Sequence, residues 1–317
     1  MAETALDPAT TTFQKEKTFS TYNQEQGKAY IEARRNYSPN VYQTIIDHHK
    51  STGGKFDVLL DVGCGPGLAT RSLAPHFTHA IGLDPSDGML ATARSLGGAT
   101  SGSEPIRYEV STAEELGVNL SAPIADGSVD LITAANAAHW FDMSGFWPAA
   151  ARVLKPGGSV AMWTSGAIQV DPSMPGAAEI DAAMLRFRDV DLLPHVLPGN
   201  ELARYRYVGL PLPWTLEKPV AEFDESTFFR KDWDGSEPFY TGVPEADLDT
   251  FEKMMSTGSP PTRWREAHPD LVGTDRDILK MLRKEIEQIL HKAGVEKGKE
   301  KIRGISHGVV LIVKKKA

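Results

Sequence analysis

A glycine-rich turn between an apolar run and a helix is the part of the sequence best suited to ligand chemistry. Residues 56–62 form the apolar run, which leads directly into Gly63, Gly65 and Gly67. Glycines at a strand-to-helix turn let the backbone come close to a bound molecule. Asp61 stands two residues before the first glycine. A carboxylate there suits an ammonium group or a water network better than a pyrophosphate, which it would repel.

The same turn departs from the fingerprint of dinucleotide-binding proteins. That fingerprint has glycine at its sixth position, where this chain has Leu68, and its glycine comes one residue earlier, at Gly67. The missing glycine is the one that allows close packing of helix on strand. Together with the negative charge of Asp61, this disfavours a nicotinamide-dependent oxidoreductase, which remains an alternative.

A second carboxylate, Asp84, ends the next apolar stretch at residues 80–84. At that place a carboxylate can accept hydrogen bonds from two ribose hydroxyls. It can also cap the turn that begins with Pro85. On the helix that follows, Met89 is placed either to lie against an adenine ring or to pack in the core.

Strands alternate with helices of about ten residues between residues 55 and 164, and this segment is predicted to be the ligand-binding core. Such alternation predicts βαβ units and a parallel sheet that is covered on both faces. Because these connections are right-handed, the expected fold is a doubly wound α/β sheet. The predicted strands are 56–62, 80–84, 106–110, 128–134 and 160–163.

The segments on either side of this core are expected to cover the carboxyl edge of the sheet. Residues 1–18 show little periodicity and are predicted to be a disordered tail. Residues 19–54 are predicted to form an N-terminal helical lid. Residues 165–222, which prolines interrupt repeatedly, are expected to be an inserted helical cap. Residues 223–317 are expected to hold the last strands of the core together with inserted helices.

Three further segments complete a resemblance to a known family. They are residues 30–39, Ala138 to Asp142 and Leu154 to Gly158. With the glycine turn and Asp84, they make the chain resemble the class I methyltransferases that use S-adenosylmethionine, in the group of fungal relatives of trans-aconitate methyltransferase. The family usually has proline where this chain has Arg35. The resemblance covers roughly residues 55–163 and implies a Rossmann-like, seven-stranded mixed sheet with an antiparallel strand among the last ones.

The resemblance also implies roles for individual residues. The glycine turn would hold the methionine part of the cofactor, the second acidic position its ribose, and the loops after the third and fourth strands its adenine and sulfonium sides. The N-terminal helix would close over the cofactor. The cofactor residues implied are Tyr30, Arg34, Asp61, Gly63, Gly65, Gly67, Asp84, Met89, Thr112, Ala113, Glu114, Asn136 and Ala137.

The expected reaction is an in-line displacement at a sulfonium methyl group, with a small molecule as methyl acceptor. Positioning in a site without water can supply most of such catalysis, and a base is needed only where the acceptor must lose a proton. His139, beyond the fourth strand, is the candidate base, although a packing role in its own turn is the favoured explanation. Tyr22, Trp140 and Trp264 are candidate acceptor contacts. Trp214 and Trp233, and the arginines at 204, 206, 263 and 265, are further hints of an acceptor pocket.

The acceptor atom is expected to be a carboxylate or hydroxyl oxygen of a metabolite, as in fungal secondary metabolism. N-methylation and a non-catalytic cofactor-binding protein are the alternatives. The sequence has 34 Lys and Arg against 42 Asp and Glu, so it does not favour nucleic acid as a partner. A single cysteine, a polar N-terminal stretch and the lack of a long apolar run favour a cytoplasmic protein without a membrane partner. The histidines show no metal-ligand spacing, and no oligomeric state follows from the sequence.

Overall fold

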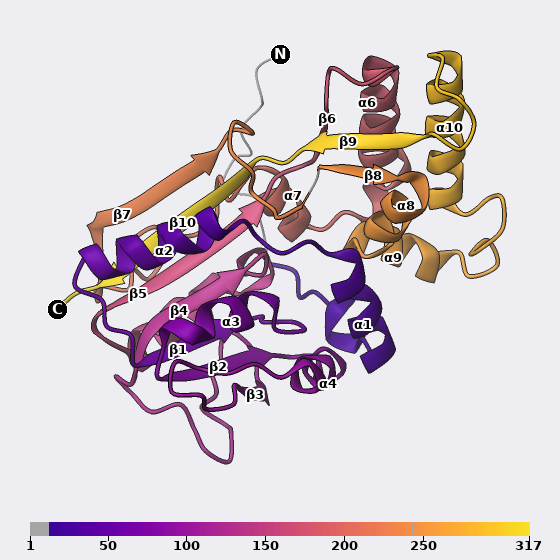
Figure 1. Ribbon diagram of the computed structural model, residues 1–317. Coiled ribbons are helices and arrows are strands. Elements are labelled where there is room, and N and C mark those ends of the chain that lie inside the picture. The colour runs from indigo at the N-terminus through magenta and orange to yellow at the C-terminus, as the bar shows by residue number, and fades with distance from the viewer. Residues whose placement is uncertain (1–12, 243) are drawn as a thin grey trace.

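The computed structural model describes residues 13–242 and 244–317, and a seven-stranded sheet runs through its centre (Figure 1). The strand order is β3-β2-β1-β4-β5-β10-β7. The first five strands pair in parallel, and β10 is antiparallel to both of its neighbours. The mixed seven-stranded sheet expected from the sequence is therefore confirmed. Its strands are β1 (Val58–Val62), β2 (His79–Asp84), β3 (Arg107–Val110), β4 (Val129–Ala135), β5 (Leu154–Ser165), β7 (Phe223–Trp233) and β10 (Gly308–Lys315).

Both faces of the sheet are buried. Successive residues of each strand point to opposite faces, and other elements cover each face. Leu59 faces a core that α2 (Pro39–Ser51), α3 (Leu68–Leu73) and α4 (Asp87–Leu96) complete. Leu60 faces the opposite core, where α5 (Met143–Val153) packs. This two-sided burial explains why the strands consist of nearly continuous apolar residues.

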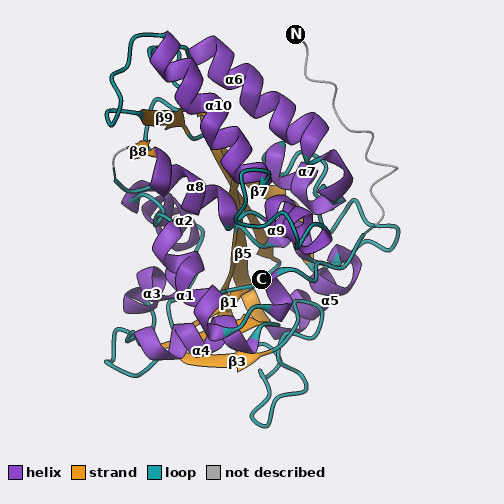
Figure 2. Ribbon diagram, turned by 90° about the vertical axis from the view of Figure 1, so that its right-hand side faces the viewer, coloured by secondary structure: helices purple, strands orange, loops and turns teal. Residues whose placement is uncertain are grey.

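A second group of elements stands beyond one end of the sheet, and we call it the cap (residues 169–204 and 245–305; Figures 1 and 2). It contains a small sheet of β6 (Gln169–Val170), β9 (Lys301–Ile305) and β8 (Glu245–Asp247). Around this sheet lie five helices: α6 (Ala177–Arg186), α7 (Pro198–Arg204), α8 (Leu248–Ser256), α9 (Ser259–Ala267) and α10 (Ile278–Lys292).

The cap is built from two stretches of chain, which differs from the single insertion expected at 165–222. Its apolar core joins residues from 174–192 with residues from 248–290. Residues 207–220, in contrast, run back and pack on the core of the large sheet. The reason is that the apolar stripe of α10 is buried against both α6 and α8, which come from the two different stretches.

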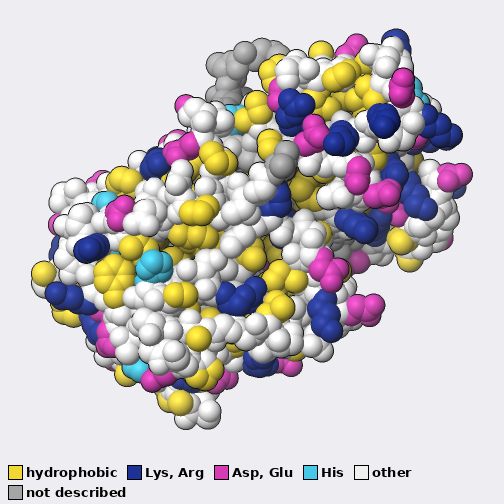
Figure 3. Space-filling model, in the orientation of Figure 1, with side chains coloured by type: hydrophobic (Ala, Val, Ile, Leu, Met, Phe, Trp, Pro, Cys, Tyr) yellow, Lys and Arg dark blue, Asp and Glu magenta, His cyan; other side chains and the backbone are white. Residues whose placement is uncertain are grey.

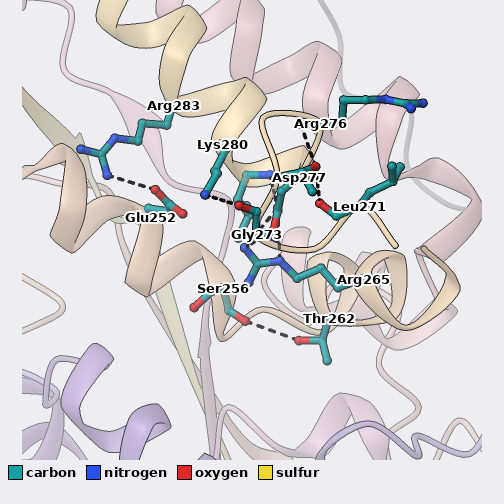
Figure 4. Close-up of polar contacts among 12 residues, drawn as sticks. Glu252, Ser256, Thr262, Arg265, Leu271, Gly273, Arg276, Asp277, Lys280 and Arg283 are labelled. Atoms are coloured by element: carbon teal, nitrogen blue, oxygen red, sulfur yellow. Dashed lines mark hydrogen bonds and ion pairs between the residues drawn. The ribbon is translucent and has the colours of Figure 1, made fainter. Parts of the chain in front are cut away.

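A buried carboxylate organises the C-terminal half of the cap (Figure 4). Asp277 caps α10 by accepting the backbone N–H of Leu279, and it also accepts hydrogen bonds from Gly273 and from the guanidinium of Arg265. Burial raises the pKa of Asp277, but the hydrogen bonds from Gly273 and Arg265 outweigh this effect and hold its pKa below the usual range. The turn before α10 is thereby fixed to α9.

The N-terminal segment that precedes β1 contacts both the helices of the large sheet and the cap. Helix α1 (Gln24–Ala33) begins with a capping box formed by Asn23 and Gln26 and lies along α4. Ahead of it, the buried carboxylate of Glu16 pairs with Arg263 of α9. The expected disordered tail therefore does not hold for residues 13–18, because this ion pair attaches them to the cap; residues 1–12 lie outside the described residues.

The surface shown in Figure 3 carries basic and acidic side chains side by side. Over the described ranges, none of the helices has both the length and the apolar character that a bilayer crossing requires.

Candidate active site

A cavity of about 720 Å³ opens at the carboxyl ends of β1, β2 and β4. Ligands of open α/β sheets bind at this edge, and small-molecule sites span roughly 300–1,000 Å³. The cavity is walled by the glycine turn and the strand-end loops on one side, and by residues of the N-terminal segment and the cap on the other.

The glycine turn forms the floor of the cavity. Gly63 has φ +64°, and a Cβ atom there would lie 2.6 Å from the Cβ of Ala137. Only glycine fits this position, because both the backbone conformation and the space exclude a side chain. Gly65, with φ +52°, directs its N–H at Asp84 with a donor–acceptor distance of 2.8 Å. The turn is thus held in place beside the cavity by Asp84 at the end of β2 and by the close approach of Ala137 after β4.

Asp84 lies at the end of β2 and lines the cavity. Its side chain accepts hydrogen bonds from the backbone N–H groups of Gly65 and Ser86, at 2.8 and 2.9 Å. Burial raises its pKa to about 6, although both hydrogen bonds act in the opposite direction. The carboxylate is therefore ionised at neutral pH and oriented before any ligand arrives.

Asp61 and Gly67 support the site from behind and do not line the cavity. Asp61 is fully buried and accepts hydrogen bonds from the hydroxyls of Thr70 and Thr133, at 2.5 and 2.7 Å. Burial raises its pKa to about 6. At Gly67, a Cβ atom would come 2.5 Å from the hydroxyl of Tyr108. The sequence predicts both residues to hold the cofactor; in the structure Asp61 joins β1 to α3 and β4, and Gly67 leaves room for the hydroxyl of Tyr108.

The loops after β3 and β4 form the next wall of the cavity. Thr112, Ala113 and Glu114 after β3 line it, as do Asn136 and Ala137 after β4, and Met89 of α4 lines the same cavity. Glu114 also accepts the backbone N–H of Asp142, at 2.9 Å. This hydrogen bond joins the loop after β3 to the segment after β4.

Arg34 belongs to the wall contributed by the N-terminal segment. Its guanidinium lies 5.0 Å from the ring centre of Tyr30 and donates to the carbonyl of Thr257 in the cap. Its buried Nε has no hydrogen-bond partner among the residues that the structure describes. A buried donor without a partner is costly in free energy, so this atom is suited to meet an acceptor on a ligand.

His139 lies in the short helix η4 (Ala138–Trp140) and lines the cavity while being only 8% exposed. Its ring centre is 4.6 Å from that of Trp140, and its Nδ1 lies 3.3 Å from the hydroxyl of Tyr207. Burial lowers the pKa of His139 to about 3. The imidazole is therefore neutral at physiological pH, as a proton acceptor or a neutral hydrogen-bonding group must be.

Several other residues that line the cavity are aromatic, and most of these aromatic residues were missed by the sequence argument. Phe19 packs with its ring centre 6.4 Å from Trp140, and Tyr37 stacks on Tyr240 with ring centres 5.4 Å apart. Trp140 was predicted as an acceptor contact and does line the cavity. The stacked pair joins residues about 200 positions apart in the chain, which no local signal in the sequence could reveal.

Several candidate acceptor residues lie elsewhere. Tyr22 is buried against Phe19 and does not line the cavity, and Trp264 stacks on His268 within the cap. Trp214 and Trp233 pack in the cores of the large sheet. The candidate arginines all pair with carboxylates of the protein: Arg204 with Asp189, Arg206 with Asp232, Arg263 with Glu16 and Arg265 with Asp277.

Comparison with known proteins identifies the central part of the chain. The family model described as a methyltransferase domain matches residues 60–162. This part of the chain is therefore similar to a methyltransferase domain. The match begins within β1 and ends within β5, so it includes the glycine turn, Asp84 and His139.

Fungal proteins are among the relatives of the methyltransferase domain. The "Probable S-adenosylmethionine-dependent methyltransferase CRG1" of Saccharomyces cerevisiae is 31% identical over 134 residues, which cover 42% of this chain and 43% of the relative. Methyltransferase ptaI of Pestalotiopsis fici is 32% identical over 140 residues, which cover 43% of this chain and 41% of the relative. The chain thus spans less than half the length of these two relatives.

A solved structure extends the likeness beyond the methyltransferase domain. The "Putative Type II Methyltransferase" from Anaeromyxobacter dehalogenans superposes with a TM-score of 0.56 and 23% identity. The superposition covers 89% of this chain and 97% of the other. At this identity the likeness shows a shared fold.

One group of potential metal ligands occurs in the cap, although the sequence shows no metal-ligand spacing. Among the described residues, Glu287, His291 and Glu300 have ligand atoms within 4.8 Å of one another. His291 and Glu300 already form an ion pair, and Glu300 also accepts the N–H of Gly298. These groups satisfy one another and do not line the cavity.

Proposed function

We propose that this protein transfers the methyl group of S-adenosylmethionine to an oxygen atom of a small metabolite. The observation that carries the proposal is that Gly63, Gly65, Asp84, Arg34 and His139 line one cavity. A methyltransferase domain supplies these residues except for Arg34. S-adenosylmethionine also appears in the printed name of the yeast relative.

The residues that line the cavity fit the parts of this cofactor. Asp84 is ionised and oriented by two backbone N–H groups, so it can accept from ribose hydroxyls. Met89 and Ala113 offer apolar surface for an adenine ring. The orphaned Nε of Arg34 fits the carboxylate of the methionine part. When bound, S-adenosylmethionine supplies an electrophilic methyl group on a positively charged sulfur.

The protein's own contribution is to position the acceptor and to exclude water. Aromatic side chains at Phe19, Trp140 and Tyr240 give the acceptor end flat, apolar walls. Holding the reacting oxygen about 3 Å from the methyl carbon and in line with the bond that breaks supplies most of the acceleration for such a transfer. His139 lines the cavity as a neutral imidazole, so its ring can accept a hydrogen bond from the acceptor's hydroxyl and take the proton as the new bond to the methyl carbon forms. Burial, which lowers its pKa to about 3, makes it a weak base.

The direct test is transfer of a labelled methyl group from S-adenosylmethionine to a panel of aromatic compounds. The panel pairs phenols with the corresponding benzoates and anilines, so that oxygen and nitrogen acceptors are compared on one ring system. We expect label in a phenol or a benzoate and none in the anilines. Label in anilines alone would overturn the assignment to oxygen. Binding of S-adenosylmethionine without methyl transfer to any compound of the panel would favour a non-catalytic binding protein.

A further inference from the structure

Tyr207 is the neighbour of His139 that the proposed chemistry has not used. It is 3% exposed and lies just after α7, where its hydroxyl meets Nδ1 of His139 at 3.3 Å and the carbonyl oxygen of Trp163 at 3.4 Å. Burial raises the pKa of Tyr207 well above its usual range. The hydroxyl therefore keeps its proton, which it can direct to Nδ1 of His139, to the carbonyl oxygen of Trp163 or to the side chain of Thr164.

The backbone holds Tyr207 in this place at a cost. Tyr207 has φ +61° and Arg206 before it has φ +51°. Residues other than glycine rarely adopt this region, and each one costs roughly 1–3 kcal/mol. Hydrogen bonds stabilise the turn: the N–H of Tyr207 donates to Leu202, and the carbonyl of Arg206 accepts from Arg230. Such strain is retained where the side chain it delivers has a use.

The helix that carries Tyr207 is also pressed against the turn that carries His139. A Cβ atom at Gly199, in the first turn of α7, would come 2.5 Å from the carbonyl oxygen of His139 and from the ring of Trp140. The first turn of α7 therefore contacts the backbone of His139. Just after the end of α7, Tyr207 brings its hydroxyl to the imidazole ring of His139. Contacts at both ends fix the orientation of the imidazole.

The contacts of the hydroxyl with Nδ1 of His139 and with the carbonyl oxygen of Trp163 are both favourable in one arrangement of protons. A carbonyl oxygen can accept a hydrogen bond but not donate one, whereas Nδ1 of a neutral imidazole can do either, depending on the tautomer. If the hydroxyl donates to Trp163, its oxygen can accept from a protonated Nδ1. If it donates to Nδ1 instead, its lone pairs face the carbonyl oxygen of Trp163, which is repulsive.

We propose that Tyr207 is a positioning residue that keeps the proton of His139 on Nδ1, so that Nε2 is left as a proton acceptor and the methyl acceptor is a hydroxyl compound. This inference rests on the proposed function. The acceptor's oxygen forms the new bond to the methyl carbon, and the carbon–sulfur bond breaks with its electrons remaining on sulfur. The hydroxyl proton of the acceptor passes to Nε2. A carboxylate acceptor would have no proton to give and no need of this tautomer.

The test is nitrogen-15 NMR of the histidine rings in the complex with S-adenosylhomocysteine, with His139 assigned by comparison with His139→Gln. We expect the ring proton on Nδ1 in the wild type. In Tyr207→Phe we expect a mixture of tautomers, and turnover of a phenolic acceptor reduced about ten- to a hundredfold with the affinity for S-adenosylhomocysteine unchanged. Tyr205→Phe, which removes a hydroxyl two residues earlier, should behave like the wild type in both measurements.

Two results separate the failure of this inference from failure of the proposed function. A ring proton on Nε2 in the wild-type complex would overturn the role of Tyr207 while leaving methyl transfer intact, and this measurement does not depend on the folding of any variant. Equal turnover of phenols by the wild type and a folded Tyr207→Phe would overturn it as well. Absence of S-adenosylhomocysteine binding by the wild type would instead remove the proposed function itself.

Discussion

The carboxylate of Glu16 lies 3.0 Å from the guanidinium of Arg263, and this ion pair joins the N-terminal segment to the cap beside the cavity, which Glu16 lines. Arg263 also donates to Thr18, to Asn200 and to the carbonyl of His195. One side chain thus connects three segments that surround the cavity.

Breaking this ion pair should loosen the closure over a bound ligand. We expect Glu16→Gln to increase the dissociation rate of S-adenosylhomocysteine about tenfold, because loss of a buried charge pair is felt mainly in the off-rate. Stopped-flow fluorescence measures this rate. Glu32→Gln, at an exposed position of α1, removes the same charge and should leave the rate unchanged. Equal rates in the wild type and both variants would count against a closing role for residues 13–18.

The affinity for the cofactor product should depend on pH. Burial raises the pKa of both Asp84 and Asp61 to about 6, so both carboxyls bind protons as the pH falls through 6. Since a ribose requires ionised Asp84, the affinity for S-adenosylhomocysteine should decrease below pH 6, and binding there should release protons. Calorimetry in buffers of different ionisation enthalpy detects this release. If Asp84→Ala releases as many protons on binding as the wild type, the protons come from a group other than Asp84.

The same two groups have a defined effect on the stability of the ligand-free protein. Their folded pKa lies above the ordinary aspartate value of 3.8. The folded state therefore binds more protons than the unfolded state between about pH 4 and pH 6, and the contribution of these groups to stability declines as the pH rises through that window. Urea unfolding across it should show this decline reduced in Asp84→Ala.

Two glycines with similar backbone conformation provide a matched test of the floor of the cavity. Gly53 has φ +83° with open space around its Cβ position, whereas Gly63 has φ +64° with Ala137 at 2.6 Å. Alanine at either position should cost about 1–2 kcal/mol of stability for the left-handed backbone, and Gly63→Ala should cost more because its methyl group would overlap with that of Ala137. Only Gly63→Ala should also lose binding of S-adenosylhomocysteine in calorimetry. A Gly63→Ala protein that binds normally would show that the turn does not contact the ligand.

Asp277 allows a test of the cap independent of the cavity. Replacing it with Asn removes the charge that Arg265 and Gly273 surround, and we expect a loss of about 2–4 kcal/mol of stability at pH 7. Because the pKa of Asp277 is held below the usual range, its stabilising effect is present above the unfolded pKa and is lost as the pH falls through the folded one. Exposed Asp275→Asn is the control, and urea unfolding is the measurement. Equal stability of the two variants would refute the role of this network.

The sequence predicts most of the large sheet because its signals are local. The short, nearly continuous apolar runs and the glycines of the turn identify β1, β2 and β4 and the place of the site between them. The same holds for Asp84, which follows a strand directly. These features need no knowledge of distant parts of the chain, and the structure confirms the mixed sheet that they imply.

The parts that could not be predicted depend on contacts between distant segments. Glu16 and Arg263 are 247 positions apart, and neither residue type is unusual at its place. The two halves of the cap meet through α6 and α10, which the sequence argument assigned to different units. Tyr207 reaches His139 through a left-handed turn that lacks glycine, so the usual signal for such a turn is missing.

The most direct test of the central claim is calorimetric titration of the protein with S-adenosylhomocysteine, with NAD as the control ligand. We predict a one-to-one complex with S-adenosylhomocysteine, no binding of NAD, and an affinity lowered about ten- to a hundredfold in Asp84→Ala through loss of a charged hydrogen bond. Binding of NAD in place of S-adenosylhomocysteine, or an Asp84→Ala variant that binds as tightly as the wild type, would contradict the account of the site.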